Sequence, residues 1–265
     1  MRAAAALLCF ALLAAPDTTY RQEIRKWRAG REASLKADWG WLTVTGLFWL
    51  HEGSNTVPGI AGAFTLDRGN IRHQESGSSR MLRPDTSGSP DILRWDSRQA
   101  FVIQRGDRFG IRLKDLNSPY RRDFTGLHWF PPDPAWRITA RFVAEPRQLR
   151  VPNILGQMDS LPSPGYAAFS LNGRELRLYP VLEEPGAQEL FFIFRDTTSR
   201  KETYGAGRFL YTDLPSGGRI VLDFNKAYNP PCAFTPYATC PLPPPQNRLP
   251  VRIEAGEMRY GHHGQ

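Results

Sequence analysis

The chain has 265 residues, of which 41% are hydrophobic and 12% aromatic. This apolar share is enough to build a hydrophobic core, which excludes a wholly disordered chain. The 23 prolines and 23 glycines argue against a helical bundle and favour many turns and short strands. The formal net charge is +8, but no run of five or more Lys or Arg residues occurs. We therefore interpret the positive charge as a solvated surface and expect no nucleic-acid partner.

Residues 1–15 have the layout of a secretory signal peptide. One arginine is followed by an apolar stretch and then by small residues before Pro16. The proline leaves the cleavage position unclear, and a buried N-terminal helix is the alternative. No apolar run of 18 or more residues is present, so we expect no membrane span. The sequence thus predicts a periplasmic or secreted protein.

Residues 17–38 have the pattern of one amphipathic helix. Tyr20, Ile24, Trp27 and Leu35 fall near one face at helical spacing. Thr19, with Gln22 three residues later, fits a capping box at the start of the helix.

After the helix the pattern changes to short strands. Residues 41–50 predict a strand pair or a strand bent at Gly46, and residues 99–104 and 108–113 predict a hairpin. A second hairpin joins two strands through Asn172 and Gly173, a pair typical of the type I′ turn because both central positions need positive φ. Further strands are expected at residues 136–143, 190–194, 208–211, 219–224 and 251–254, and a loop at residues 76–90.

About ten short strands and one helix predict an all-β fold. We expect a single sandwich or barrel-like domain over residues 39–260, followed by a tail at residues 261–265. No P-loop, nucleophile-elbow, zinc-protease, Cys-x-x-Cys or calcium-loop motif occurs. We therefore expect no cofactor and no metal site, and the sequence leaves open whether the protein is an enzyme.

Residues 221–257 (VLDFNKAYNPPCAFTPYATCPLPPPQNRLPVRIEAGE) stand out in composition. Seven prolines lie between Pro230 and Pro245, so this stretch is stiff and offers few backbone donors to a sheet. Ordering a long irregular loop costs about 1–2 kcal/mol per residue, and such loops usually have a function.

The motifs of this segment resemble those of the DUF1684 family of bacterial and archaeal proteins. They are Asn229-Pro-Pro-Cys-Ala-Phe234, Cys240-Pro-Leu-Pro-Pro244, Asn247-Arg-Leu249 and Glu254-Ala-Gly-Glu257, with earlier matches at Trp41-Leu42, Trp49-Leu50, Phe192-Ile-Phe-Arg-Asp196, Thr203-Tyr204 and Gly207-Arg-Phe209. The resemblance extends over about residues 23–257. Because the family has no assigned function, the resemblance implies the position of a site beside the Cys/Pro-rich loop and no particular chemistry.

Cys232 and Cys240 admit four interpretations. In an exported protein the simplest is a disulfide that closes the loop, with a stabilisation of about 2–3 kcal/mol. The alternatives are a metal site, a thiol activated by Arg208, Arg248 or Arg252, and inert packing.

Polar residues flanking the loop are the candidate site. Asp223 or Glu254 is the candidate general base, and Arg208 is the candidate group that stabilises an anion. The remaining candidate ligand contacts are Arg195, Asn225, Tyr228, Asn229, Asn247 and Glu257. The alternative is that these groups form ion pairs and caps that hold the loop.

Our leading hypothesis is an exported protein that binds a small organic molecule in a pocket beside residues 225–250. A hydrolase using the candidate base is one alternative. A structural or protein-interaction domain that presents the proline-rich loop is the other. The oligomeric state is not determined by the sequence.

Overall fold

The computed structural model describes residues 16–261, so the predicted signal peptide and nearly all of the predicted tail lie outside the described residues. Helix α1 (Pro16–Lys36) buries Tyr20, Ile24 and Leu35, which confirms the predicted apolar face. Residues 16–18 are already helical, so the capping-box start at Thr19 was wrong. Within the described residues, no helix is long and apolar enough to cross a membrane.

The first strand group contains two four-stranded antiparallel sheets, with strand orders β1-β8-β7-β6 and β2-β3-β4-β5. Both sheets contribute to one hydrophobic cluster, in which Phe64, Val102 and Ile111 are buried. The bounds are β1 Val44–Trp49, β2 Gly53–Asn55, β3 Ala63–Asp67, β4 Asn70–Glu75, β5 Ser78–Leu82, β6 Leu93–Trp95, β7 Arg98–Arg105 and β8 Arg108–Asp115. The loop expected at residues 76–90 was therefore wrong for β5, which pairs with β4.

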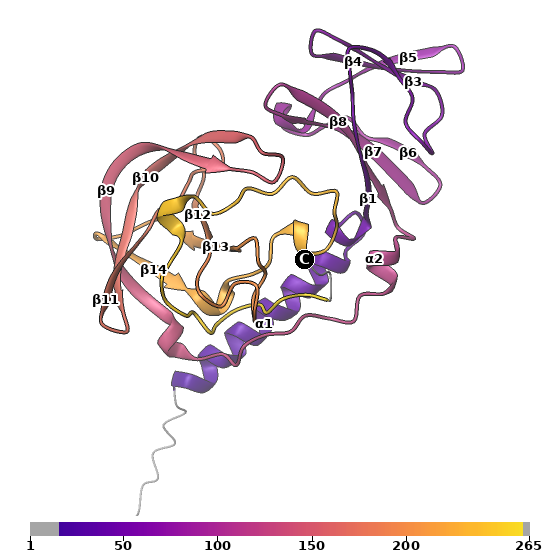
Figure 1. The fold of residues 1–265 in the computed structure, drawn as a ribbon. Helices are drawn as coiled ribbons and strands as arrows, with labels where there is room; N and C mark the ends of the chain where they lie inside the picture. The colour runs from indigo at the N-terminus through magenta and orange to yellow at the C-terminus, as the bar shows by residue number, and fades with distance from the viewer. Residues whose placement is uncertain (1–15, 262–265) are drawn as a thin grey trace, which may run out of the picture.

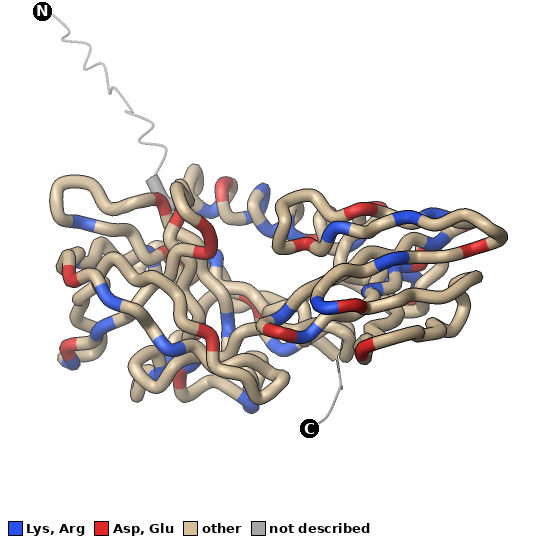
Figure 2. Tube along the Cα trace, turned by 90° about the horizontal axis from the view of Figure 1, so that it is seen from above, with Lys and Arg blue, Asp and Glu red and all other residues tan. Residues whose placement is uncertain are grey.

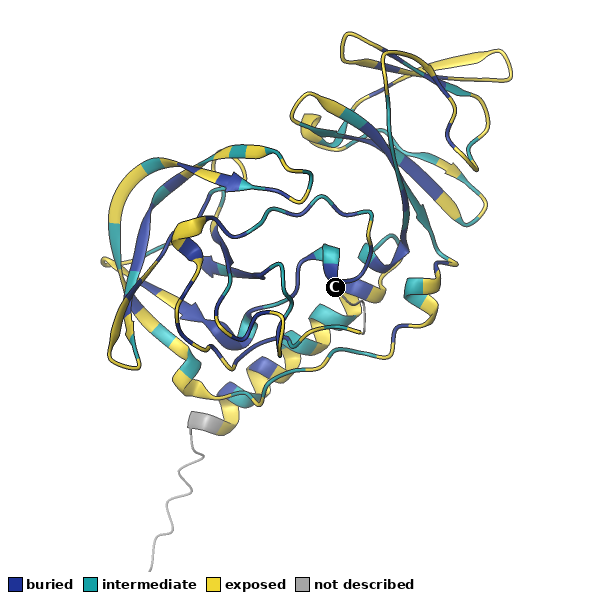
Figure 3. Cartoon of the chain, viewed as in Figure 1, coloured by how far each residue is buried: buried dark blue, intermediate teal, exposed yellow. Residues whose placement is uncertain are grey.

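The second strand group contains the sheet β11-β10-β9-β14 and the two-stranded ribbon β12-β13. Its bounds are β9 Arg137–Pro152, β10 Met158–Leu171, β11 Arg174–Leu178, β12 Glu189–Phe194, β13 Arg208–Asp213 and β14 Arg219–Asp223. Strand β12 has apolar residues at consecutive positions because both of its faces are buried (Figure 3). Phe192 and Phe194 enter one hydrophobic cluster, whereas Phe191 and Ile193 enter another.

Both predicted hairpins are confirmed. Arg105 pairs with Arg108 across a two-residue turn between β7 and β8. Asn172 and Gly173 have φ angles of 52° and 73°, as the type I′ turn requires. The predicted bend at Gly46 is also present, as a register shift between Val44 and Gly46 in the pairing of β1 with β8.

Within residues 224–261, the segment after β14 forms isolated β-bridges and no extended strand. Its regular pieces are the short 3-10 helices η4 (Phe224–Lys226), η5 (Pro231–Ala233) and η6 (Pro245–Asn247). The strand predicted at residues 251–254 was wrong. The carbonyls of Ile253 and Ala255 accept hydrogen bonds from the Arg208 side chain instead of from a neighbouring strand.

Helix α1 runs along the second strand group and ends near α2 and the start of β1 (Figure 1). The C-terminal segment contacts it through Asn229, Phe234 and Glu257. The other short helices are η1 (Trp41–Thr43), η2 (Asp85–Ser87), α2 (Pro119–Arg122) and η3 (Pro134–Trp136). The expected all-β class with one N-terminal helix is confirmed. Residues of both charge signs are dispersed along the chain (Figure 2).

Candidate functional site

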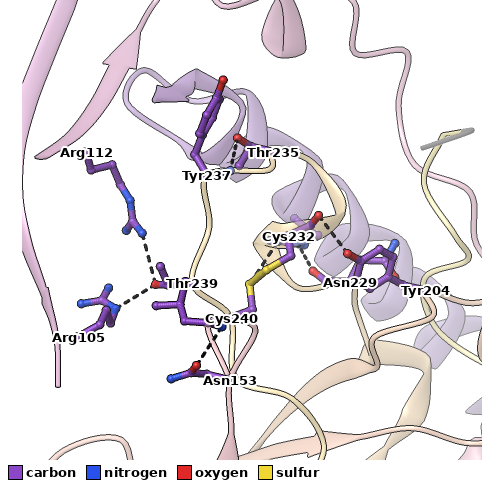
Figure 4. Close-up of a disulfide and its surroundings, with 12 residues drawn as sticks. Arg105, Arg112, Asn153, Tyr204, Asn229, Cys232, Thr235, Tyr237, Thr239 and Cys240 are labelled. Atoms are coloured by element: carbon purple, nitrogen blue, oxygen red, sulfur yellow. Dashed lines mark hydrogen bonds between the residues drawn. A yellow bond between two sulfur atoms is a disulfide. The ribbon is translucent and has the colours of Figure 1, made fainter. Parts of the chain in front are cut away.

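The Cys/Pro-rich loop is closed by a disulfide between Cys232 and Cys240, whose Cα atoms lie 6.3 Å apart (Figure 4). The backbone N–H of Cys232 also donates to Sγ of Cys240 at 3.2 Å. The disulfide interpretation is thus confirmed, and it removes the free-thiol alternative. Residues 16–261 contain no group of three or more His, Cys, Asp or Glu side chains placed to hold a metal ion.

Arg208 is fully buried and holds the end of the C-terminal segment. Its Nη2 lies 2.5 Å from Oδ2 of Asp196 and 3.0 Å from the carbonyl of Ile253. Nη1 donates to the carbonyl of Ala255. Burial lowers the pKa of Arg208, and the nearby Asp196 carboxylate opposes that shift. The bonds of this guanidinium are therefore with groups of the protein itself.

The carbonyls on either side of Glu254 bond Arg208, but the Glu254 carboxylate pairs with a different arginine. Glu254 is exposed, and its carboxylate accepts hydrogen bonds from Arg252 at 2.6 and 2.8 Å. The structure does not bring together Asp223, Glu254 and Arg208, the three residues expected to carry catalysis.

Asp223 joins β14 to helix α1. Its Oδ1 accepts a 2.7 Å hydrogen bond from the Tyr20 hydroxyl and a 3.2 Å bond from the backbone N–H of Asn225, which caps η4. Burial, followed by the bond to Asp223, raises the pKa of Tyr20. The Asn225 amide bonds the Tyr20 hydroxyl and the backbone of Asp133. These groups fix the helix against the sheet.

Asn229 and Glu257 form a second buried contact with α1. The Asn229 amide donates to Oε1 of Glu257 at 2.7 Å, and Arg31 donates to the Asn229 carbonyl at 3.0 Å. Nε of Arg31 lies 3.6 Å from the other carboxylate oxygen of Glu257. Burial raises the pKa of Glu257 to about 7, although Arg31 acts in the opposite direction.

Asn247 and Arg195 connect the loop to neighbouring segments by hydrogen bonds to backbone groups. The buried Asn247 amide accepts from Tyr179 N–H and donates to the carbonyls of Tyr179 and Ile193. Arg195 bridges to Arg248 through its backbone. Both residues act as structural links.

A cavity of about 360 Å³ lies beside the loop, against Pro231, Cys240 and Pro241. Five of its twelve lining residues are aromatic. Phe191 stacks on Tyr211 with ring centroids 4.7 Å apart and meets the edge of Phe209 at 4.8 Å. Tyr228 lies nearly parallel to Tyr211, and Trp41 completes the aromatic lining.

Four polar side chains also line this cavity. Arg31 lies 4.5 Å over the Tyr228 ring, and Glu183 accepts a hydrogen bond from the Tyr211 hydroxyl. Arg105 forms an ion pair with Asp85 at 2.9 Å and donates to Oγ1 of Thr239 at 2.9 Å. Few polar groups in an aromatic enclosure are typical of a small-molecule site.

A second cavity of about 780 Å³ lies between α1 and strands β13 and β14. It shares Arg31, Tyr211 and Tyr228 with the first cavity and includes Asp223 in its lining. Among the residues predicted from sequence, Tyr228 and Cys240 line the smaller cavity, and Asp223 and Tyr228 line the larger one.

The model of the DUF1684 family, described as a protein of unknown function, matches residues 122–258. This chain belongs to the DUF1684 family. The match confirms the resemblance for the region that contains the Cys/Pro-rich loop, and the quoted motifs before residue 122 lie outside it.

The solution NMR structure of an uncharacterized protein from Haloarcula marismortui is 32% identical to this chain. The similarity covers 55% of this chain and 83% of that protein, with a TM-score of 0.46. A search of curated proteins found no match.

Only part of the cavity lining lies in the region that the DUF1684 model matches. The matched region supplies Glu183, Thr239 and four of the aromatic walls, whereas Arg31, Trp41 and Arg105 precede it. Sequence reasoning missed most of these residues because they come from separate elements. One signal was present in the sequence. The consecutive apolar residues of β12 indicate a strand with both faces buried, so its phenylalanines lie on both faces.

Proposed function

We propose that this DUF1684 protein binds a small organic molecule with a flat apolar body in the 360 Å³ cavity beside the disulfide loop. The supporting observation is the enclosure formed by Trp41, Phe191, Phe209, Tyr211 and Tyr228. Aromatic rings offer large, rigid contact areas to a flat ligand, and the few polar groups orient it.

The arrangement favours binding over hydrolysis. The residues considered for a catalytic base and an anion-stabilising group lie in three separate environments: Asp223 under α1, Glu254 at the surface and Arg208 in a buried ion pair. Acid–base catalysis needs such groups within hydrogen-bond reach of one substrate.

The loop itself favours a pocket over an interaction surface. A protein-interaction module would project its proline-rich loop outward, yet Ala233, Phe234, Ala238 and Cys240 of this loop are buried. The loop therefore acts as one wall of the core and of the cavity.

We also propose that the protein is exported to an oxidising compartment. The disulfide between Cys232 and Cys240 supports this, because such bonds persist mainly outside the cytosol. The intact mass of the protein recovered from its native host tests export. A mass lacking the N-terminal segment supports it, and the full-length mass contradicts it.

The binding proposal is tested by calorimetric titration of the native protein with 2-naphthamide, a flat and neutral probe. We expect saturable binding that Tyr211→Leu weakens about tenfold, because the substitution removes one ring face of the cavity. The matched control is Tyr166→Leu, since Tyr166 belongs to the same hydrophobic cluster and does not line the cavity. Absence of binding, or equal binding by both variants, contradicts the proposal.

A further inference from the structure

Strand β8 carries a row of cations on one face. Its apolar residues Phe109, Ile111 and Leu113 pack into the core of the first strand group. Because side chains alternate along a strand, Arg108, Arg112 and Lys114 lie on the opposite face. Each of these cations lies over an aromatic ring: Arg108 over Trp49 at 4.0 Å, Arg112 over Trp41 at 5.2 Å and Lys114 over Phe101 at 5.7 Å.

Arg112 is the buried member of this row, and among residues 16–261 it forms no ion pair with a carboxylate. Only 4% of its surface is exposed. Within the described residues, its side chain makes one hydrogen bond, from Nη2 to Oγ1 of Thr239 at 3.4 Å, and its Nε has no partner. A buried cation with unsatisfied donors is costly unless an acceptor approaches it.

Burial, and then the charge of Arg105, lower the pKa of Arg112 to about 10, and the Asp85 carboxylate acts in the opposite direction. Arg112 therefore remains protonated at neutral pH and retains its charge for an incoming anion.

Thr239 connects Arg112 to the cavity. Its Oγ1 accepts hydrogen bonds from Arg105 at 2.9 Å and from Arg112 at 3.4 Å, and both arginines point to it in Figure 4. The hydrogen bonds among residues 16–261 assign the hydroxyl proton no acceptor. Thr239 and Arg105 line the cavity, so the part of the wall that they form offers hydroxyl and guanidinium donors to the interior.

The other charges of the cavity already have partners or lie at another wall. Arg105 is paired with Asp85, and Arg31 lies beside Glu257. Glu183 is bonded to the Tyr211 hydroxyl, where it repels an anion. An anionic group is therefore attracted to the wall formed by Thr239.

We propose that Thr239, Arg105 and Arg112 form a carboxylate subsite, so that the ligand of the cavity is an organic carboxylate. Its flat body lies among the aromatic rings, and its carboxylate accepts hydrogen bonds from the Thr239 hydroxyl and the Arg105 guanidinium, which line the cavity. Arg112, bonded to Thr239 from behind the lining, adds positive charge. This inference rests on the proposed binding function and adds the charge of the ligand.

The test compares 2-naphthoate with its neutral analogue 2-naphthamide in calorimetric titrations of the native protein. We expect 2-naphthoate to bind about 10- to 100-fold more tightly, as is usual for hydrogen bonds to charged groups. Arg112→Gln is expected to reduce 2-naphthoate affinity to the level of the amide. The matched control is Arg108→Gln, a cation on the same strand face that, among the described residues, has no hydrogen bond to Thr239, and it is expected to leave both affinities unchanged.

The outcomes separate the two proposals. Equal affinity for both probes overturns the carboxylate subsite and leaves the binding function standing, whereas absence of binding by both overturns the two together. If Arg112→Gln does not fold, Thr239→Val carries the test, with Thr65→Val on β3 as its control. Thr239→Val is expected to weaken 2-naphthoate several-fold and spare 2-naphthamide, and an equal effect on both probes overturns the subsite.

Discussion

A fully buried guanidinium needs acceptors for its donors, and Arg208 obtains them from one carboxylate and two backbone carbonyls. Asp196 is itself buried and accepts from the backbone N–H of Thr198. The carbonyls come from Ile253 and Ala255, which lie outside the strands. Arg208 therefore satisfies these two carbonyls, whereas Leu249 and Val251 bond the backbone of Arg195 and Thr197.

We predict that Arg208→Gln lowers the free energy of unfolding by about 3–5 kcal/mol, because it leaves Asp196 buried without its cation. Urea denaturation of the native protein and the variant measures this difference. The control is Arg252→Gln, since Arg252 is exposed and pairs with Glu254 at the surface, and little change in the midpoint is expected. An unchanged midpoint for Arg208→Gln contradicts its anchoring role.

At the scale of the element, the Cys/Pro-rich loop is ordered by means other than a sheet. Prolines remove backbone donors and restrict the chain before folding, which lowers the entropy that ordering costs. The disulfide closes a loop with a sequence separation of 8 residues, and the Asn247 side chain bonds the backbone of Tyr179, directly after β11, and of Ile193 in β12. Gly256 has φ of 79°, and a Cβ there would lie 2.4 Å from the Ala227 carbonyl, so glycine is required for this close approach.

We predict that replacing Cys232 and Cys240 together by alanine lowers the free energy of unfolding by about 2–3 kcal/mol, because the unfolded chain regains the freedom of the small loop. Denaturation with and without reductant measures the effect. Reductant is expected to destabilise the native protein and to leave the double variant unchanged. A destabilisation of the double variant by reductant would show that the effect arises elsewhere.

At the scale of the whole molecule, helix α1 connects parts of the chain that are far apart in sequence. Tyr20 bonds Asp223, Arg31 contacts Asn229 and Glu257, and Leu35 packs with Phe234 of the loop. Both cavities use Arg31 from this helix. The position of α1 therefore determines the shape of the proposed binding site.

The Glu257 contact makes this connection sensitive to pH. Its pKa is raised to about 7 in the folded protein from an ordinary value of 4.5, so the folded state binds more protons between these values. The free energy of unfolding therefore falls as pH rises through this range. We predict a loss of about 2–3 kcal/mol from this group between pH 5 and pH 8.

Denaturation of the native protein and of Glu257→Gln at pH 5 and pH 8 measures this contribution. Glutamine keeps an acceptor for the Asn229 amide and does not ionise, so the difference in stability between the two proteins is expected to shift with pH in favour of the variant. A difference that stays constant would show that Glu257 is ionised throughout the range.

Local signals in the sequence were sufficient for much of the fold. The spacing of Tyr20, Ile24 and Leu35 predicts the buried face of α1, and Asn172-Gly173 predicts a type I′ hairpin, because these patterns depend on residues a few positions apart. The pattern failed at residues 251–254, where alternating apolar residues predict a strand. The carbonyls of Ile253 and Ala255 accept hydrogen bonds from the Arg208 side chain there, and no strand forms. The pattern also failed at β5, whose polar residues form an edge strand by pairing with β4.

The sequence by itself determined the all-β class, the N-terminal helix, the hairpins and the unusual nature of the Cys/Pro-rich loop. Only the tertiary structure decided that Arg208 and Asn229 hold the fold, that Glu254 is exposed, and that the cavity gathers Arg31, Trp41, Arg105 and Tyr211. The physical reason is that turns and periodic patterns are set by neighbouring residues. The environment of a buried charge, and the walls of a cavity, are set by side chains that meet across distant parts of the chain.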